Sequence, residues 1–142
     1  GVVGPRGLPL LKPPYTTITA FDMNRGEILW QVPNGDKMAR VDAHPALDGL
    51  DLPPLGGGGR HPVLVTSTLL IHGQDMGYGP NLIARDKTTG EELARIGLSG
   101  APQSAPISYA VDNKQYIALG INDAPIPKLV VFALPTNLGE NE

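Results

Sequence analysis

A ten-residue pattern occurs twice in the chain and constrains its fold more than any other feature. It reads A-x-D-x-x-x-G-E-x-L and begins at Ala20 and again at Ala84. A degenerate third copy begins at Ala133, with proline in place of the aspartate. Self-similarity at a fixed internal spacing is typical of a repeated structural unit, so we expect a repeat protein.

Each copy of the pattern predicts a β-hairpin. The aspartate, Asp22 or Asp86, can accept hydrogen bonds from the turn backbone. The glycine, Gly26 or Gly90, supplies the positive φ that closes such a turn. The expected strands around the pattern are residues 17–21, 27–32, 82–84, 91–96 and 129–134.

Two further predicted hairpins alternate with these. One joins residues 62–66 to 69–73, and the other joins residues 106–111 to 115–120. Alternating apolar residues at 107, 109 and 111 are typical of a half-buried strand. If the four strands of one unit are called a, b, c and d, the expected strands follow one another along the chain in the order b-c, d-a-b-c, d-a-b. Only one unit is then complete, and it covers residues 69–111. We therefore expect an all-β fold of antiparallel four-stranded blades, a partial β-propeller of about two blades.

Composition agrees with this class and excludes others. Glycine and proline make up 18 + 15 = 33 of the 142 residues, against an average of about 12%, which excludes a helical bundle. The 41% of apolar residues exclude disorder, and the net charge of −3 without a basic run argues against a nucleic-acid partner. No apolar stretch is long enough to span a bilayer. The absence of cysteine excludes disulfides, thiolate zinc sites and a cysteine nucleophile. We expect one domain over residues 1–142, which begins like an excised piece because Gly1 opens no signal peptide.

The long glycine- and proline-rich connections predict where function lies. In an up-and-down sheet, the connections after alternate strands emerge at the same edge, so all the long segments should lie on one face. These segments are residues 1–16, 33–61, 74–81, 97–105 and 121–128. Loops held on a rigid scaffold commonly carry binding and chemistry, although they also serve packing and assembly.

Several segments resemble a known family. They are Lys12-Pro13-Pro14-Tyr15, residues 18–22, residues 26–33, Gly35-Asp36, residues 85–90, Tyr109, Lys114-Gln115-Tyr116-Ile117 and Phe132-Ala133-Leu134-Pro135. Together they resemble the C-terminal part of the dehydrogenases that depend on pyrroloquinoline quinone (PQQ), in the branch that is similar to glucose dehydrogenase. Other propellers share the repeat. The segments Lys12-Pro13-Pro14-Tyr15, Lys114-Gln115-Tyr116-Ile117 and Phe132-Ala133-Leu134-Pro135 are together more specific for this family.

The resemblance implies an eight-bladed propeller of which this chain is a C-terminal fragment. It implies PQQ near the central axis with a divalent ion, commonly calcium, oxidation of sugars or alcohols at the quinone C5 carbonyl with a carboxylate base, and a periplasmic location. The family's base and metal ligands lie in upstream blades, so we expect no catalytic and no metal-binding residue in this chain, and no PQQ bound by it alone. Trp30 matches the family's tryptophans that stack between blades, whereas Ala94 departs from that pattern.

The candidates for cofactor contact all lie in the long connections or beside them. They are Lys12, Arg60, His61, Gln74, Asp75 and Asn122. Asn122 matches a position near PQQ where related enzymes often carry histidine or glycine. The alternatives are a solvated Lys12, a flexible spacer around the glycine run before Arg60, and a surface loop at Asn122.

The other polar residues predict structural roles. The three histidines show no metal-binding spacing, and His72 lies in an apolar strand as a core residue would. The acidic residues of the longest connection, Asp36, Asp42, Asp48 and Asp51, lack the pattern of a calcium loop. We expect them on a solvated surface, with helix caps around residues 36–47.

Three hypotheses stay open at this point. The chain is part of a PQQ-dependent sugar or alcohol dehydrogenase and inactive alone, or a non-catalytic propeller module for binding or assembly, or a chain that closes a ring with copies of itself or with companion blades. Incomplete blades expose strand edges and apolar faces, so we expect a homo-oligomer.

Overall fold

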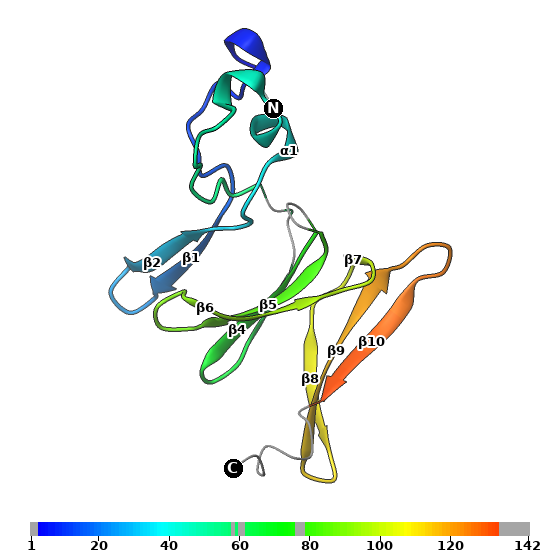
Figure 1. Cartoon of the computed structure of the whole chain (residues 1–142). Coiled ribbons are helices and arrows are strands. Elements are labelled where there is room, and N and C mark those ends of the chain that lie inside the picture. Colours follow the sequence, from blue (N-terminus) through cyan, green and yellow to red (C-terminus); the bar gives the residue numbers. More distant parts are fainter. Residues whose placement is uncertain (1–2, 58, 60–61, 76–78, 134–142) are drawn as a thin grey trace, which may run out of the picture.

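The computed structural model describes residues 3–57, 59, 62–75 and 79–133, and nearly all of its regular structure is β (Figure 1). The strands are β1 (Thr17–Asp22), β2 (Glu27–Pro33), β3 (Val63–Val65), β4 (Leu69–Gln74), β5 (Asn81–Asp86), β6 (Glu92–Gly97), β7 (Ala101–Pro102), β8 (Ile107–Val111), β9 (Lys114–Asn122) and β10 (Lys128–Ala133). The helical elements are η1 (Pro5–Gly7), α1 (Ala39–Asp42) and η2 (Pro45–Leu47).

The strands form three antiparallel sheets (Figure 1). The first sheet is the hairpin β1–β2, and the middle sheet has the order β3-β4-β5-β6. In the last sheet, β9 pairs with β10 on one side and with both β8 and the short β7 on the other. The all-β, blade-like architecture expected from the sequence is confirmed.

The turns of the repeat form as predicted. Asp22 Oδ1 accepts hydrogen bonds from the backbone N–H groups of Asn24 (2.9 Å) and Arg25 (3.2 Å), and Gly26 has φ +69°. The second copy repeats this arrangement, because Asp86 Oδ1 accepts from Thr88 N–H at 2.7 Å and from Thr89 N–H at 3.0 Å, and Gly90 has φ +77°. The third copy lies outside the described residues after Ala133.

The two hairpins between the repeats also form, each with its own turn chemistry. Between β8 and β9, Asp112 (φ 49°) and Asn113 (φ 61°) are both left-handed and join the paired residues Val111 and Lys114. Two left-handed central residues define the type I′ turn, whose twist suits a hairpin. Between β3 and β4, the hydroxyl of Thr66 accepts from Leu69 N–H at 2.9 Å.

The boundaries of the complete unit differ from the prediction. The four-stranded sheet runs from Val63 to Gly97, and not over residues 69–111. The strand β8 pairs with β9 of the last sheet and not with β6. The connection that follows β6 therefore leads from one sheet to the next, whereas the connection between β4 and β5 stays within a sheet.

The core lies between the middle and last sheets. Its buried residues are Ile71 and Leu82 from the middle sheet and Leu119 and Ile121 from the last. In the last sheet, Val130 lies opposite Leu119, and Phe132 opposite Ile117, so these residues share the face that packs against the core. Face-to-face packing of this kind buries one face of each sheet.

Trp30 joins the first sheet to the middle one. Its indole lies against Gly90, where a Cβ would fall 2.6 Å from Trp30 Cε3, and its Nε1–H donates to Lys87 O at 2.9 Å. The side chain is buried. The predicted inter-blade role of Trp30 is confirmed. Ala94, the matching residue of the second copy, lies on β6 opposite Ala84 and is exposed.

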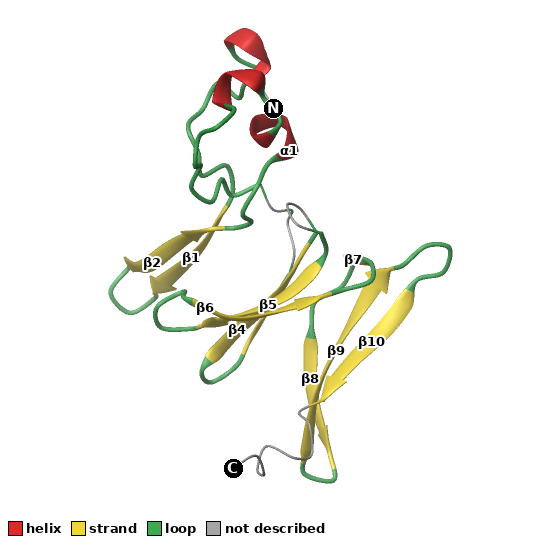
Figure 2. Cartoon of the chain, in the orientation of Figure 1, coloured by secondary structure: helices red, strands yellow, loops and turns green. Residues whose placement is uncertain are grey.

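A side lobe, formed by residues 3–16 and 34–57, adjoins the first sheet and contains the helical elements of the described chain (Figure 2). It begins where Asn34 N–H donates to Thr16 O at 2.9 Å. The helix cap at η2 is His44, whose Nδ1 accepts from Ala46 N–H at 3.2 Å. Among the described helices, none has the length and apolar character needed to cross a membrane.

Candidate functional site

Long connections meet at one edge of the middle and last sheets, as the up-and-down topology predicts. The connection after β6 contacts the one before β5, because Leu98 N–H donates to Pro80 O at 2.9 Å. It also contacts the connection after β9, where the hydroxyl of Ser99 donates to Asp123 Oδ2 at 2.7 Å. We call this edge the loop edge. Short turns lie at the other ends of the strands (Figure 1).

The short strand β7 lies between the ends of β4 and β9 at the loop edge. Ala101 pairs with Asn122 of β9. On its other side, Pro102 covers Gly73 of β4 so closely that a Cβ on Gly73 would lie 2.4 Å from Pro102 Cβ. Gly73 is thus required for the close approach. The contact brings the final residues of β4 and β9, Gln74 and Asn122, to the two sides of one strand.

These two candidate residues differ in exposure. The side chain of Gln74 is fully buried at 0% exposure, whereas Asn122 is exposed at the end of β9. Asp75 directly follows Gln74 and is half-buried. Asn122 and Asp75 lie where a ligand at the loop edge could reach them, whereas Gln74 is covered by the chain itself. The cofactor roles of all three stay predictions.

Asp123 fixes the loop edge next to Asn122. Its Oδ2 accepts from both the Ser99 hydroxyl and Lys128 Nζ at 2.7 Å. The hydrogen bond from Lys128, with that from Ser99, holds the pKa of Asp123 below its ordinary value. Gly100 permits this packing, because a Cβ there would lie 2.3 Å from Asn122 O.

The remaining candidates lie elsewhere. Lys12 is exposed in the side lobe, in a different segment from β7. Arg60 and His61 lie outside the described residues. The structure therefore groups Gln74, Asp75 and Asn122 at the loop edge and does not bring Lys12 to β7.

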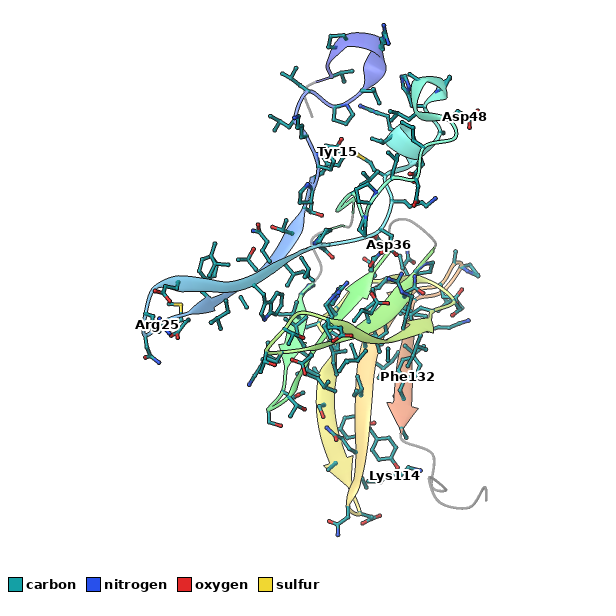
Figure 3. All side chains as sticks on the ribbon, turned by 60° about the vertical axis from the view of Figure 1, so that its left-hand side comes forward. Tyr15, Arg25, Asp36, Asp48, Lys114 and Phe132 are labelled. Atoms are coloured by element: carbon teal, nitrogen blue, oxygen red, sulfur yellow. The ribbon has the colours of Figure 1, made fainter. Side chains whose placement is uncertain are left out.

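The described residues contain no group of three or more histidine or acidic side chains arranged to hold a metal ion. His72 is a buried core histidine, as predicted, with Nδ1 3.1 Å from Gly73 O and Nε2 accepting from Arg85 Nε at 3.3 Å. All four aspartates of the longest connection line a cleft of about 480 Å³ together with Lys37; they are Asp36, Asp42, Asp48 and Asp51. Asp48 lies at the far end of the side lobe, whereas Asp36 lies where the lobe meets the middle sheet (Figure 3).

A partly buried network of charges runs across the middle sheet, and no sequence motif points to it. Arg85, on β5, donates to Gly90 O at 3.1 Å and to Glu92 Oε2 at 3.3 Å in addition to His72. On β6, Arg95 donates two hydrogen bonds to the carboxylate of Glu92, from Nε to Oε1 at 2.7 Å and from Nη2 to Oε2 at 2.9 Å. The one available signal was Arg85 itself, a charged residue within an apolar strand, because such a residue must be paired when it is buried.

The pKa values in this network follow from burial and pairing. Burial lowers the pKa of Arg85, although Glu92 opposes this effect. The hydrogen bonds from Arg95 lower the pKa of Glu92, and the bonds to Glu92 raise the pKa of Arg95. The shifts of Glu92 and Arg95 both favour their charged forms near neutral pH. The network stabilises a sheet and offers no group poised for proton transfer.

The chemistry available at the loop edge is that of binding. Asn122 offers an amide donor and acceptor, Asp75 offers a carboxylate, and the backbone of β7 separates them. Such groups suit a polar ligand rich in oxygen atoms.

Comparison with known proteins places the chain in a family. Residues 1–117 match the family model described as the PQQ glucose/ethanol/alcohol dehydrogenase, β-propeller domain. The chain is 30% identical over 139 residues to the quinoprotein glucose dehydrogenase of Gluconobacter oxydans, which covers 90% of this chain and 16% of that protein. It is 32% identical over 141 residues to the glycerol dehydrogenase large subunit of Gluconobacter thailandicus (91% and 18%), and 33% identical over 126 residues to a probable quinate dehydrogenase (quinone) of Xanthomonas campestris (83% and 15%).

Among solved structures, a quinohemoprotein alcohol dehydrogenase from Pseudomonas putida is similar over 74% of this chain and 12% of its own, with a TM-score of 0.49 and 22% identity. The chain spans less than a fifth of the length of the relatives it matches. The family model nevertheless covers most of the chain, and the three antiparallel sheets are those of propeller blades. The chain belongs to the β-propeller family of the PQQ-dependent glucose, ethanol and alcohol dehydrogenases.

Proposed function

We propose that this chain supplies blades to a PQQ-dependent oxidoreductase that acts on sugars or alcohols. The observation that carries the proposal is the junction of Trp30 with Gly90 and Lys87, which packs successive sheets through the residues of the repeat. It occurs within the segment that matches the family model. Relatives named for glucose, glycerol and quinate all take substrates with oxidisable hydroxyl groups, which supports this substrate class.

The loop edge is the part of the chain that we propose to face PQQ in the complete propeller. Its groups fit the cofactor in one respect, because the quinone and carboxylate oxygens of PQQ accept hydrogen bonds such as the Asn122 amide can donate. We assign no calcium ligand and no base to the described residues. When bound, PQQ supplies the redox chemistry, and the role proposed for this chain is to shape and close one side of its site.

A hybrid enzyme tests the proposal. The matching segment of the Gluconobacter oxydans quinoprotein glucose dehydrogenase is replaced by this chain, and glucose-dependent dye reduction is measured with and without PQQ and calcium. We expect a folded hybrid whose dye reduction requires PQQ. A hybrid that folds and binds PQQ but reduces no dye would contradict the proposal.

A second function, in assembly, is supported by the outer face of the last sheet. Cross-strand register places Ile107, Tyr109 and Val131 on the face opposite the core, and their exposed fractions are 56%, 40% and 47%. Tyr109 and Tyr116 stack there with ring centroids 5.3 Å apart. A contiguous apolar sheet face is typical of an interaction surface. We propose that further blades, or a second copy of this chain, cover it.

Light scattering on the purified chain at micromolar concentration tests self-association. We expect a mass that is a multiple of 15.0 kDa. A monomeric mass would show that copies of the chain do not cover this face. Charged substitution of an exposed residue, such as Val131→Lys, should shift an oligomer toward the monomer while leaving the circular dichroism of the sheets unchanged.

We also propose a periplasmic location, supported by the resemblance to quinoprotein dehydrogenases. Fractionation of the source cells, followed by detection of the chain with an antibody, tests this proposal. Recovery with the cytoplasmic fraction would contradict it.

A further inference from the structure

A charged contact between residues far apart in sequence ties the side lobe to the middle sheet. Asp36 Oδ2, in the lobe, accepts a hydrogen bond from Nη1 of Arg95 on β6 at 2.7 Å, and 59 positions separate the two residues. Both side chains are 29% exposed. Partial shielding of this degree makes the pair stronger than a fully solvated surface pair.

Arg95 is held in place independently of the lobe. Its Nε and Nη2 both donate to the carboxylate of Glu92, so the remaining Nη1 points toward Asp36. Glu92 in turn accepts from Arg85, whose side chain is only 9% exposed. A guanidinium fixed in this way loses little conformational freedom when it binds a second carboxylate. Arg95 is therefore a pre-organised hydrogen-bond donor for Asp36.

Asp36 occupies a structurally central position within the lobe. Its backbone carbonyl accepts from Leu55 N–H at 2.8 Å, and the adjacent Gly35 O accepts from Gly56 N–H at 2.9 Å. Leu55 O then accepts from Tyr15 N–H at 2.8 Å, which joins the two segments of the lobe. An anchor at Asp36 therefore acts on the residue where these backbone contacts converge.

The rest of the lobe is attached to the first sheet through the chain at Thr16 and Asn34. At this junction the Thr16 hydroxyl lies 3.0 Å from Asn34 O and 2.5 Å from Gly56 O, so the two carbonyls share its single proton. These contacts hold the base of the lobe but do not reach β6. The contact to Arg95 adds a charged link between the lobe and β6 of the middle sheet.

We propose that Asp36 and Arg95 form a clamp that fixes the position of the side lobe on the middle sheet, with Glu92 as the group that orients Arg95. The role that we assign to the two residues is to position the lobe. The inference goes beyond the proposed function and does not depend on it, because it concerns contacts within this chain.

Amide hydrogen exchange, measured by NMR, tests the clamp at single residues. In Asp36→Asn, the charge-assisted contact is lost, and we expect exchange of the Tyr15, Leu55 and Gly56 amides to accelerate about tenfold, the loss expected for a hydrogen bond between charged groups. Amides in the ladder between β4 and β5 should keep their wild-type rates. Arg95→Lys, which keeps the charge but loses the fork geometry, should accelerate the same three amides to a smaller extent.

The matched control is Glu27→Gln, which removes the ion pair between Arg25 and Glu27 at the exposed tip of the first hairpin, where the side chains are 69% and 59% exposed. It should leave the three lobe amides unchanged. Wild-type rates at the lobe amides in Asp36→Asn would overturn the proposal. An equal acceleration at every amide of the chain would also overturn it, because that result indicates a contribution to global stability and not a local clamp.

Discussion

The indole of Trp30 and the backbone of Gly90 are in direct contact across the junction of two sheets. A Cβ on Gly90 would lie within 3.0 Å of three indole carbons, Cε3, Cδ2 and Cζ3. The same glycine has φ +77° and closes the turn between β5 and β6. Gly90 therefore closes the turn of its own hairpin and also leaves room for the indole of Trp30 from the preceding hairpin of the repeat.

The turn and the contact with Trp30 can be separated by comparing alanine substitutions at Gly90 and at Gly26, because only Gly90 contacts the indole. Gly26→Ala places alanine at φ +69° with open space around it, so we expect a loss of about 1 kcal/mol from the backbone alone. Gly90→Ala has the same backbone cost and also displaces Trp30, which should add about 1–3 kcal/mol. Urea unfolding measures both variants, and equal losses of stability would contradict the contact.

The hydrogen bond of Trp30 can be tested apart from its packing. Trp30→Phe keeps an aromatic ring against Gly90 but removes the donor to Lys87 O. Because the partly buried carbonyl then loses a partner and the ring is smaller, we expect a loss of about 2–3 kcal/mol in the free energy of unfolding. Thermal unfolding followed by circular dichroism measures this loss, and an unchanged midpoint would contradict the predicted contribution.

The charge network predicts loss of stability in acid. Pairing with Arg95 holds the pKa of Glu92 below its ordinary value of 4.5, so its contribution to stability is present above that pH and is lost as the pH falls through the lower folded-state pKa. The pKa values of Asp86 and Asp123 are lowered as well, which acts in the same direction.

Glu92→Gln isolates the part that belongs to Glu92. The difference in melting temperature between wild type and variant should be largest near neutral pH and should shrink as the pH falls below about 4.5. A difference that stays constant down to the lowest pH at which the wild type is folded would show that the Glu92 carboxylate does not carry the effect.

The approach of β7 to β4 predicts a steric effect at Gly73. In Gly73→Ala, the new methyl group would meet Pro102 Cβ at 2.4 Å and Cγ at 2.6 Å, so β7 must move away from β4. We expect a destabilisation of about 1–3 kcal/mol, typical of overpacking. Gly97→Ala is the control, since nothing lies within 4 Å of its Cβ position. Equal stability of the two variants would argue against the position of β7.

The hairpins could be predicted from the sequence because their signals are local. Asp22 with Gly26, and Asp86 with Gly90, encode turns whose geometry depends on few neighbouring residues. The grouping of hairpins into sheets could not be predicted in the same way. The connections after β4 and after β6 are both long, and nothing local in the sequence shows that β5 pairs with β4 whereas β8 does not pair with β6.

The loop edge was predictable from topology, but its details were not. The topology placed Gln74 and Asn122 at the same edge, but it did not predict that Gln74 is buried whereas Asn122 is exposed. The clamp between Asp36 and Arg95 was also beyond sequence patterns, because 59 positions, including β3, β4 and β5, separate the two residues.

The central claim is that successive hairpins pack as propeller blades through Trp30 and Gly90. NMR on the labelled chain tests it directly, since Trp30 is the single tryptophan of the sequence. We predict nuclear Overhauser effects between the indole ring protons and the α-protons of Gly90, and an upfield ring-current shift of those α-protons. Absence of these cross-peaks, together with Trp30 fluorescence like that of tryptophan in water, would contradict the account.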